Sequence, residues 1–170
     1  AVNDIFGHST GDRVLIHAAS GGVGLAAFAT LVVAYVLARD PALNGWDGLG
    51  MAVQAYSKRA RPVLAWADAL GRDTGRIMQV RLVKGAYWDS EIKRAQVEGQ
   101  IDYPVFTQKH HTDVSYLACA RKLLGAIDKV FPQFATHNAH TVASIVSIAE
   151  DVCGKYQIGH YEFQCLHGMG

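Results

Sequence analysis

Short apolar runs alternate with longer helical stretches along this chain, and this alternation restricts the fold more than any other feature of the sequence. The strand-like runs are 13–18, 49–56, 76–84, 130–135 and 161–166. Between them, helices are expected over 25–38, 58–70, 89–97, 113–124 and 139–150, and 58–70 carries apolar residues at helical spacing. Strands that alternate with helices predict an α/β domain built on a parallel sheet.

A few residues predict where the helices begin and end. Asp40-Pro41 should end the first helix, because proline disfavours helical geometry in the residue before it. Gly71 follows the helix expected over 58–70, and Thr112 is a candidate N-cap of the helix over 113–124. The pair His110-His111 is expected to lie in a solvated loop before that helix.

Polar side chains follow four of the predicted strands at the point where each strand ends. In parallel α/β sheets, catalytic and binding groups gather at the carboxyl ends of the strands, where the following loops converge. Any single one of these polar groups could simply cap the next helix, but four strand ends with the same pattern predict a functional site. The residues are Gln54, Arg81 with Lys84, Thr136 with His137, and Gln164 with His167.

The run RLVKGAYW, residues 81–88, indicates the kind of ligand. Two cations, Arg81 and Lys84, end an apolar strand, where they are costly to bury without anionic partners or acceptors. Gly85 lets a ligand approach the backbone closely, and Tyr87 and Trp88 can pack on a flat ring. A planar, partly anionic ligand that carries phosphate meets these demands, and a flavin dinucleotide is such a ligand.

Composition excludes several other classes of protein. The chain has 16 Lys and Arg against 15 Asp and Glu, so no basic surface for nucleic acid is predicted. Three scattered cysteines favour reduced thiols in the cytoplasm over a disulfide framework.

The apolar stretch 25–38 is shorter than the roughly 20 residues that span a bilayer. His137 and His140 have the spacing of a metal pair, but no third ligand is suggested, so we predict no metal site.

Long blocks of the sequence resemble the proline dehydrogenase domain of the bifunctional proline utilisation A flavoenzymes. The blocks are RLVKGAYWDSEIKRAQ, TDVSYLACARKLL, PQFATHNAHT and YEFQCLHGMG, with WDGLGMAVQAYSKRA similar to the family segment just upstream. The resemblance implies that residues 36–170 form an incomplete (β/α)8 barrel of TIM type with about four barrel strands. Residues 1–35 are expected to form a separate strand-turn-helix segment. Because a complete barrel usually takes about 250 residues, the open sheet edges are expected to favour self-association.

The same resemblance implies a reaction. The family binds FAD at the carboxyl ends of its strands and oxidises L-proline to pyrroline-5-carboxylate, passing hydride to flavin N5 and electrons onward to a quinone in the membrane. It therefore implies a cytoplasmic protein, with peripheral contact to the inner membrane in the parent family.

Family roles can be carried over residue by residue. Arg81, near the reactive N5 edge, and Tyr87, beside the proline pocket, are the candidate catalytic residues. The candidate cofactor-binding residues are Gln54, Arg81, Val83, Lys84, Gly85, Ala86, Trp88, Thr136 and His137. The family's substrate lysine and aspartate are expected upstream of WDGLG, and its paired arginines on the last helix, so this chain is expected to hold the flavin part of the site without the substrate part.

A second resemblance leaves other functions open. GDRVLIHAASGGVGLAA is similar to the cofactor-binding turn of medium-chain dehydrogenases and quinone oxidoreductases. There Gly21 and Gly24 would let a helix N-terminus approach a pyrophosphate, although a structural strand-turn-helix without ligand has the same pattern. The alternatives are therefore an NADPH-dependent quinone oxidoreductase-like protein and a non-catalytic α/β fragment that binds no cofactor.

Overall fold

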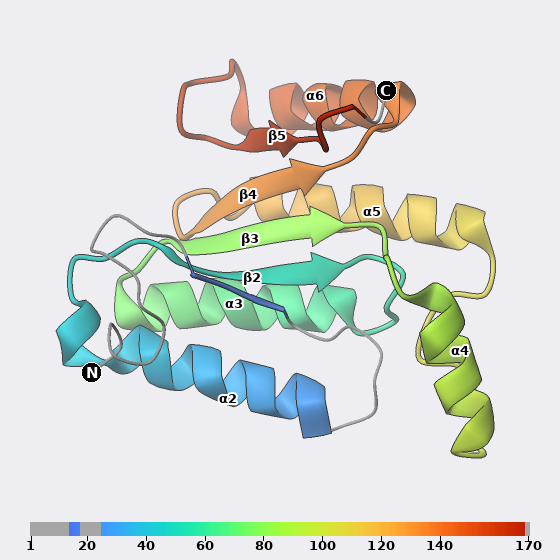
Figure 1. Cartoon of the computed structure of the whole chain (residues 1–170). Helices are drawn as coiled ribbons and strands as arrows, with labels where there is room; N and C mark the ends of the chain where they lie inside the picture. Colours follow the sequence, from blue (N-terminus) through green and yellow to red (C-terminus); the bar gives the residue numbers. More distant parts are fainter. Residues whose placement is uncertain (1–13, 18–24, 169–170) are drawn as a thin grey trace.

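A parallel sheet with helices packed on it forms the centre of the protein (Figure 1). The computed structural model describes residues 14–17 and 25–168. The strands lie in the order β1-β2-β3-β4-β5, and every neighbouring pair is parallel. Their bounds are Val14–His17 for β1, Leu49–Gln54 for β2, Met78–Val83 for β3, Val130–Ala135 for β4 and Glu162–Gln164 for β5. The predicted parallel α/β fold is therefore confirmed.

Helices connect successive strands. They are α2 (Leu25–Arg39), the short 3-10 helix η1 (Pro41–Leu43), α3 (Ala60–Thr74), α4 (Trp88–Val97), α5 (Lys109–Leu124) and α6 (Ala139–Cys153). Helices α2, α3 and α5 contact the sheet directly, and α6 packs against α5. Helix α4 stands apart from this layer, beyond the carboxyl end of β3 (Figure 1).

The hydrophobic core lies between the sheet and its helices. Along β3, Met78, Val80 and Leu82 are fully buried, whereas the residues between them are only half-buried. Since side chains alternate between the two faces of a strand, Gln79, Arg81 and Val83 share the opposite face. The period-2 pattern thus separates an apolar face covered by helices from a face that carries polar side chains.

The strand register brings the ends of neighbouring strands together. Gln54 at the end of β2 lies opposite Val83, and Arg81 lies opposite Gln133 on β4. Strand β1 extends the same sheet by pairing with β2, with Val14 opposite Leu49. Within the described residues β1 and β5 are the outer strands and do not pair with each other, so the sheet is the incomplete barrel that was predicted.

The helix expected over 58–70, with its end near Gly71, extends further in the structure. Helix α3 continues to Thr74 and ends at Gly75, whose φ of +71° is the left-handed conformation that glycine adopts easily. Gly71 lies inside the helix, where a Cβ atom would be 2.8 Å from the backbone oxygen of Lys129. Its small size is therefore required by close packing against the loop before β4.

The predicted start of the next helix is also wrong. Helix α5 begins at Lys109, with Gln108 at the cap position and no side-chain cap hydrogen bond there. Thr112 is buried within the first turns and caps nothing, and the pair His110-His111 is helical. None of the described helices is long and apolar enough to cross a membrane.

Candidate functional site

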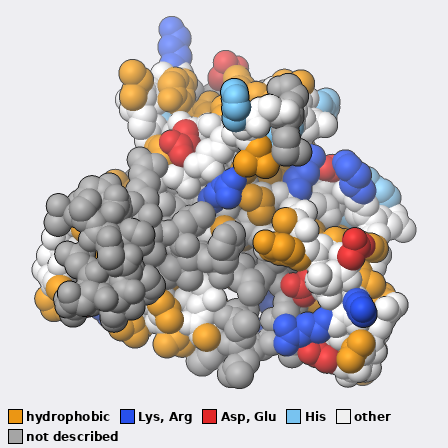
Figure 2. All heavy atoms as spheres, viewed as in Figure 1, with side chains coloured by type: hydrophobic (Ala, Val, Ile, Leu, Met, Phe, Trp, Pro, Cys, Tyr) orange, Lys and Arg blue, Asp and Glu red, His pale blue; other side chains and the backbone are white. Residues whose placement is uncertain are grey.

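The predicted site residues lie at the carboxyl edge of the sheet, where β2, β3 and β4 end side by side. In the orientation of Figure 1 this edge is on the right, next to α4. In Figure 2 the same side of the visible surface carries basic and acidic side chains interspersed with apolar ones. The site is thus assembled from loops that follow strands far apart in the sequence.

The turn after β3 is fixed by hydrogen bonds to the end of β2. The backbone N–H of Ala55 donates to the carbonyl of Val83, and that of Tyr56 donates to the carbonyl of Lys84, both at 2.8 Å. The buried side chain of Gln54 then accepts a hydrogen bond from the N–H of Ala86 at 3.2 Å. Gln54 therefore holds the turn through its carbonyl oxygen, and its amide nitrogen takes no part in this hydrogen bond.

Gly85 is required by packing within the chain. Its φ is +151°, and a Cβ atom at this position would lie 2.4 Å from a ring carbon of Tyr56. Tyr56 itself is buried, so its ring cannot move aside without disturbing the core. The sequence suggested close approach of a ligand as the reason for this glycine, whereas the described atoms provide an internal reason.

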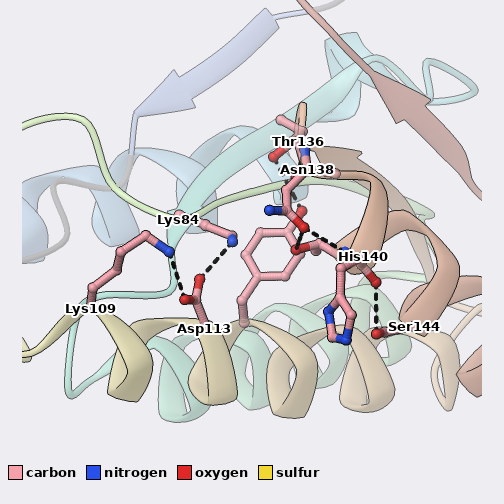
Figure 3. Close-up of polar contacts among 10 residues, drawn as sticks. Lys84, Lys109, Asp113, Thr136, Asn138, His140 and Ser144 are labelled. Atoms are coloured by element: carbon pink, nitrogen blue, oxygen red, sulfur yellow. Dashed lines mark hydrogen bonds and ion pairs between the residues drawn. The ribbon is translucent and has the colours of Figure 1, made fainter. Parts of the chain in front are cut away.

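Lys84 forms an ion pair with a residue that the sequence did not single out. Its Nζ lies 2.6 Å from Oδ1 of Asp113 on α5, and Nζ of Lys109 lies 2.7 Å from the other carboxylate oxygen. Figure 3 shows both lysines pointing toward the one carboxylate. Hydrogen bonds from Lys109 and then Lys84 lower the pKa of Asp113. The carboxylate between them fixes where the Lys84 ammonium lies.

Below this ion pair, a buried tyrosine joins the ends of two strands. The hydroxyl of Tyr116 lies 3.2 Å from the carbonyl oxygens of both Leu82 on β3 and Ala135 on β4. Burial raises the pKa of Tyr116, so its hydroxyl stays protonated and remains a donor. The Nζ of Lys84 is 6.0 Å from the centre of its ring. Tyr116 thus joins the carboxyl ends of β3 and β4, from which the site residues extend.

The three other cationic and aromatic candidates differ in their surroundings. Arg81 is half-buried, and its Nε donates a 2.7 Å hydrogen bond to Oε1 of Gln164 on β5. Trp88, at the start of α4, donates from its indole nitrogen to the carbonyl of Phe106 at 2.9 Å. Tyr87 is 59% exposed, so its ring is available to a ligand.

The end of β4 is shaped by the cap of α6. Asn138 caps this helix by accepting a 2.9 Å hydrogen bond from the N–H of Thr141, and its own N–H donates to the hydroxyl of Thr136. His137 accepts a hydrogen bond from the N–H of Leu166 at 3.3 Å, which ties the end of β4 to the segment after β5. Figure 3 shows Thr136 and Asn138 at the start of α6, facing the same region as Lys84.

The geometry therefore brings the candidate residues of β2, β3 and β4 to one edge. It also adds Asp113, Tyr116 and Asn138, which sequence reasoning left without a site role, whereas Gln164 was already among the polar strand ends. Of the three additions, only Asn138, as a cap residue directly before a helix, carried a signal in the sequence. Among the described residues no group of three His, Cys, Asp or Glu side chains could hold a metal ion. The glycine turn with Gly21 and Gly24 lies outside the described residues.

The donor set suits a planar anionic ligand. Guanidinium and ammonium groups, amide N–H groups and hydroxyls line this edge, and two exposed aromatic rings stand beside them. Cationic and amide donors are the groups that bind phosphate and carbonyl oxygens, and aromatic faces pack on a flat ring. The chemistry of the residues present thus fits a flavin nucleotide.

Comparison of the sequence with known proteins gives a family match and relatives that agree with each other. The family described as proline dehydrogenase matches residues 26–170. The bifunctional protein PutA of Escherichia coli (strain K12) is 56% identical over 131 residues, which are 77% of this chain and 10% of that protein. The chain thus spans a small part of the length of the curated relatives it matches.

Solved structures agree with this family match. A crystal structure of a mutant of Bradyrhizobium japonicum proline utilization A (PutA) superposes with a TM-score of 0.80 at 50% identity, covering 93% of this chain and 15% of that one. Proline utilization A from Bdellovibrio bacteriovorus, inactivated by N-propargylglycine, gives a TM-score of 0.82 at 32% identity over 92% of this chain and 16% of that one.

Proposed function

This chain belongs to the proline dehydrogenase family, and on that premise we propose that it forms the flavin-binding part of an enzyme that oxidises L-proline to pyrroline-5-carboxylate. Since it spans 10% of the length of the Escherichia coli relative, the activity, substrate and partners of the whole protein enter here as part of the proposal. The quinone oxidoreductase alternative is not favoured by the family match.

The observation that carries the proposal is the convergence of Gln54, Arg81 and Lys84 on one edge of a parallel sheet. Each side chain is already held in place: Gln54 by Ala86, Arg81 by Gln164 and Lys84 by Asp113. A site that is ordered before a ligand arrives loses little conformational entropy on binding. This supports a binding role rather than a set of unrelated surface contacts.

We assign the cofactor as FAD, which when bound supplies the acceptor for the hydride that leaves proline. The amide N–H groups of Gln54 would donate to the isoalloxazine, and Arg81 would lie near its reactive edge. Lys84, Thr136 and His137 would bind the ribityl and dinucleotide part, together with the turn of Val83, Gly85 and Ala86. Trp88 would pack beside the cofactor, and the exposed ring of Tyr87 would line the proline pocket.

The electron acceptor in this proposal is a quinone. We place the protein in the cytoplasm with peripheral contact to the inner membrane, where a quinone is available. The outer strands β1 and β5 offer unpaired edges within the described sheet, so self-association through these edges is a further part of the proposal.

A titration of FAD with the purified chain, followed by flavin fluorescence, tests the proposal. L-proline is then added without oxygen, and the flavin absorbance is recorded. Saturable quenching with bleaching by proline supports both binding and turnover. Saturable quenching without bleaching supports a flavin-binding part that needs further residues for the substrate. No quenching would contradict the proposal.

Substitution of Arg81 adds a test at residue level. Arg81→Met should weaken FAD binding or shift the reduction potential of the bound flavin, because it removes the cation nearest the proposed ring position. Arg121→Met is the matched control, since Arg121 is exposed on α5 and pairs with Asp151. An Arg81→Met variant with unchanged affinity and potential would remove this role from Arg81.

A further inference from the structure

Two successive hydrogen bonds connect Arg81 to the outermost strand of the sheet. The Nε of Arg81 donates to Oε1 of Gln164 at 2.7 Å, and Nε2 of Gln164 donates to Oε1 of Glu162, also at 2.7 Å. Arg81 is on β3, whereas Gln164 and Glu162 are both on β5. The chain of contacts therefore passes over the whole width of β4.

The register explains why this contact is feasible. Arg81 lies opposite Gln133 on β4, and Gln133 lies opposite Glu162, while Gln164 lies opposite Ala135. Neighbouring strands are about 4.8 Å apart, so only two long side chains on the same face can meet across an intervening strand. The small side chain of Ala135 leaves the diagonal path from Arg81 to Gln164 open.

The orientation of the Gln164 amide is determined by its two neighbours. A guanidinium only donates hydrogen bonds and an ionised carboxylate only accepts them. Gln164 can satisfy both at once only with its oxygen toward Arg81 and its nitrogen toward Glu162, which is the arrangement observed. Glu162 thus fixes which end of the amide Arg81 meets.

The partner of Arg81 is neutral, and this distinguishes it from the other cation of the site. Lys84 pairs directly with the carboxylate of Asp113. Arg81 forms no ion pair within the described part of the chain and uses only Nε for its side-chain hydrogen bond, so the outer nitrogens of its guanidinium keep their donors. An amide partner holds the guanidinium in place without neutralising its charge.

We propose that Gln164 is a positioning residue that holds the Arg81 guanidinium toward the flavin site with its positive charge intact, and that Glu162 fixes the Gln164 amide for this role. The inference rests on the proposed function, because the retained charge of Arg81 is proposed to act on the bound flavin. A positive charge at this position favours the reduced, more electron-rich flavin over the oxidised form.

The first test needs no flavin. In the purified chain, hydrogen exchange of the Arg81 Nε–H is measured by NMR, with the signal identified through its loss in Arg81→Lys. Gln164→Met, which keeps the length but not the hydrogen bond, should accelerate this exchange about tenfold. Glu162→Met should have a smaller effect in the same direction. Equal exchange in the parent chain and in Gln164→Met would overturn the positioning role.

The second test measures the effect of the Arg81 charge on the reduction potential of the flavin. Gln164→Glu places a carboxylate next to Arg81 and should weaken binding of reduced relative to oxidised flavin about tenfold, which is about 30 mV for a two-electron couple. Gln157→Glu adds the same charge in an exposed loop and should leave the potential unchanged. An unchanged potential in Gln164→Glu would overturn the charge argument. If the parent chain binds no flavin, the proposed function fails, while the exchange measurement still decides the role of Gln164.

Discussion

The carboxylate of Asp113 lies 2.6 Å from Nζ of Lys84, although the two residues belong to different elements, α5 and the turn after β3. The pair is about one-third exposed, and Lys109 shares the same carboxylate from the preceding helical turn. Ion pairs at such positions contribute little to stability. Their importance here is geometric, because Asp113 determines where the ammonium proposed to meet the cofactor is held.

Asp113→Asn should lower the free energy of unfolding by less than about 1 kcal/mol at pH 7. Because hydrogen bonds from the two lysines lower the pKa of Asp113, its contribution is present above the unfolded pKa of about 4 and is lost as pH falls through the folded pKa. Urea unfolding at pH 7 and pH 3 should therefore show a difference from the parent chain that is smaller in acid. Asp151→Asn, at a more exposed pair, is the control. An equal loss at both pH values would contradict this assignment.

Gly85→Ala should destabilise the chain by about 1–3 kcal/mol, because the added methyl group would meet the buried ring of Tyr56 at 2.4 Å. Gly99→Ala is a matched control, since Gly99 also has a positive φ but its added methyl group would have no atom within 4 Å. Thermal unfolding of both variants measures the difference. The cost at Gly85 should shrink in a Tyr56→Ala background, and a cost independent of Tyr56 would show that backbone strain alone is responsible.

Tyr116→Phe should lower the free energy of unfolding by about 1–2 kcal/mol, because two backbone carbonyls at the ends of β3 and β4 lose their shared donor. Tyr35→Phe, on an exposed ring, should cost almost nothing. Burial raises the pKa of Tyr116, so its contribution is complete below the unfolded pKa of about 10 and is lost as pH rises above it. An alkaline absorbance titration should reveal one tyrosine that ionises only at the highest pH, and this tyrosine should be missing in Tyr116→Phe. Its presence in the variant would refute the assignment.

Much of the fold could be predicted because it depends on local patterns. Short strand-like runs and the helical stretches between them predicted the order of strands and helices, and a parallel sheet then placed Gln54, Arg81 and Thr136 at one edge. The run RLVKGAYW suggested the kind of ligand, the family resemblance supplied the reaction, and the family match supports the same function. The individual site roles stay predictions.

The contacts that hold the site in place could not be predicted, because they join residues far apart in the sequence. Nothing near Lys84 indicates that Asp113 is its partner, and nothing near Gly85 indicates the ring of Tyr56. The errors at Gly71 and Thr112 have the same origin. Each residue type is common at helix ends, but tertiary packing at that position placed it inside a helix instead.

Arg76 is another residue whose role became visible only in three dimensions. It precedes β3 at the amino edge of the sheet and is only 8% exposed. Its guanidinium donates to the backbone carbonyls of Ala38, Leu43 and Trp46 at 2.7, 2.6 and 3.0 Å. One side chain thus holds the whole segment between α2 and β2, far from the carboxyl edge that carries the candidate site.

Arg76→Met should lower the free energy of unfolding by about 2–4 kcal/mol, since it leaves buried carbonyls without a donor. The free energy of unfolding of Arg76→Lys should lie between those of the parent chain and Arg76→Met. A single ammonium cannot reach all three acceptors in the geometry of a planar guanidinium. Urea unfolding measures both, with the exposed Arg61→Met as the control. Flavin affinity of the folded Arg76 variants should equal that of the parent chain, because this residue lies at the opposite edge of the sheet. A loss of affinity as large as that of Arg81→Met would mean that the two edges are coupled and that Arg76 does more than hold the segment before β2.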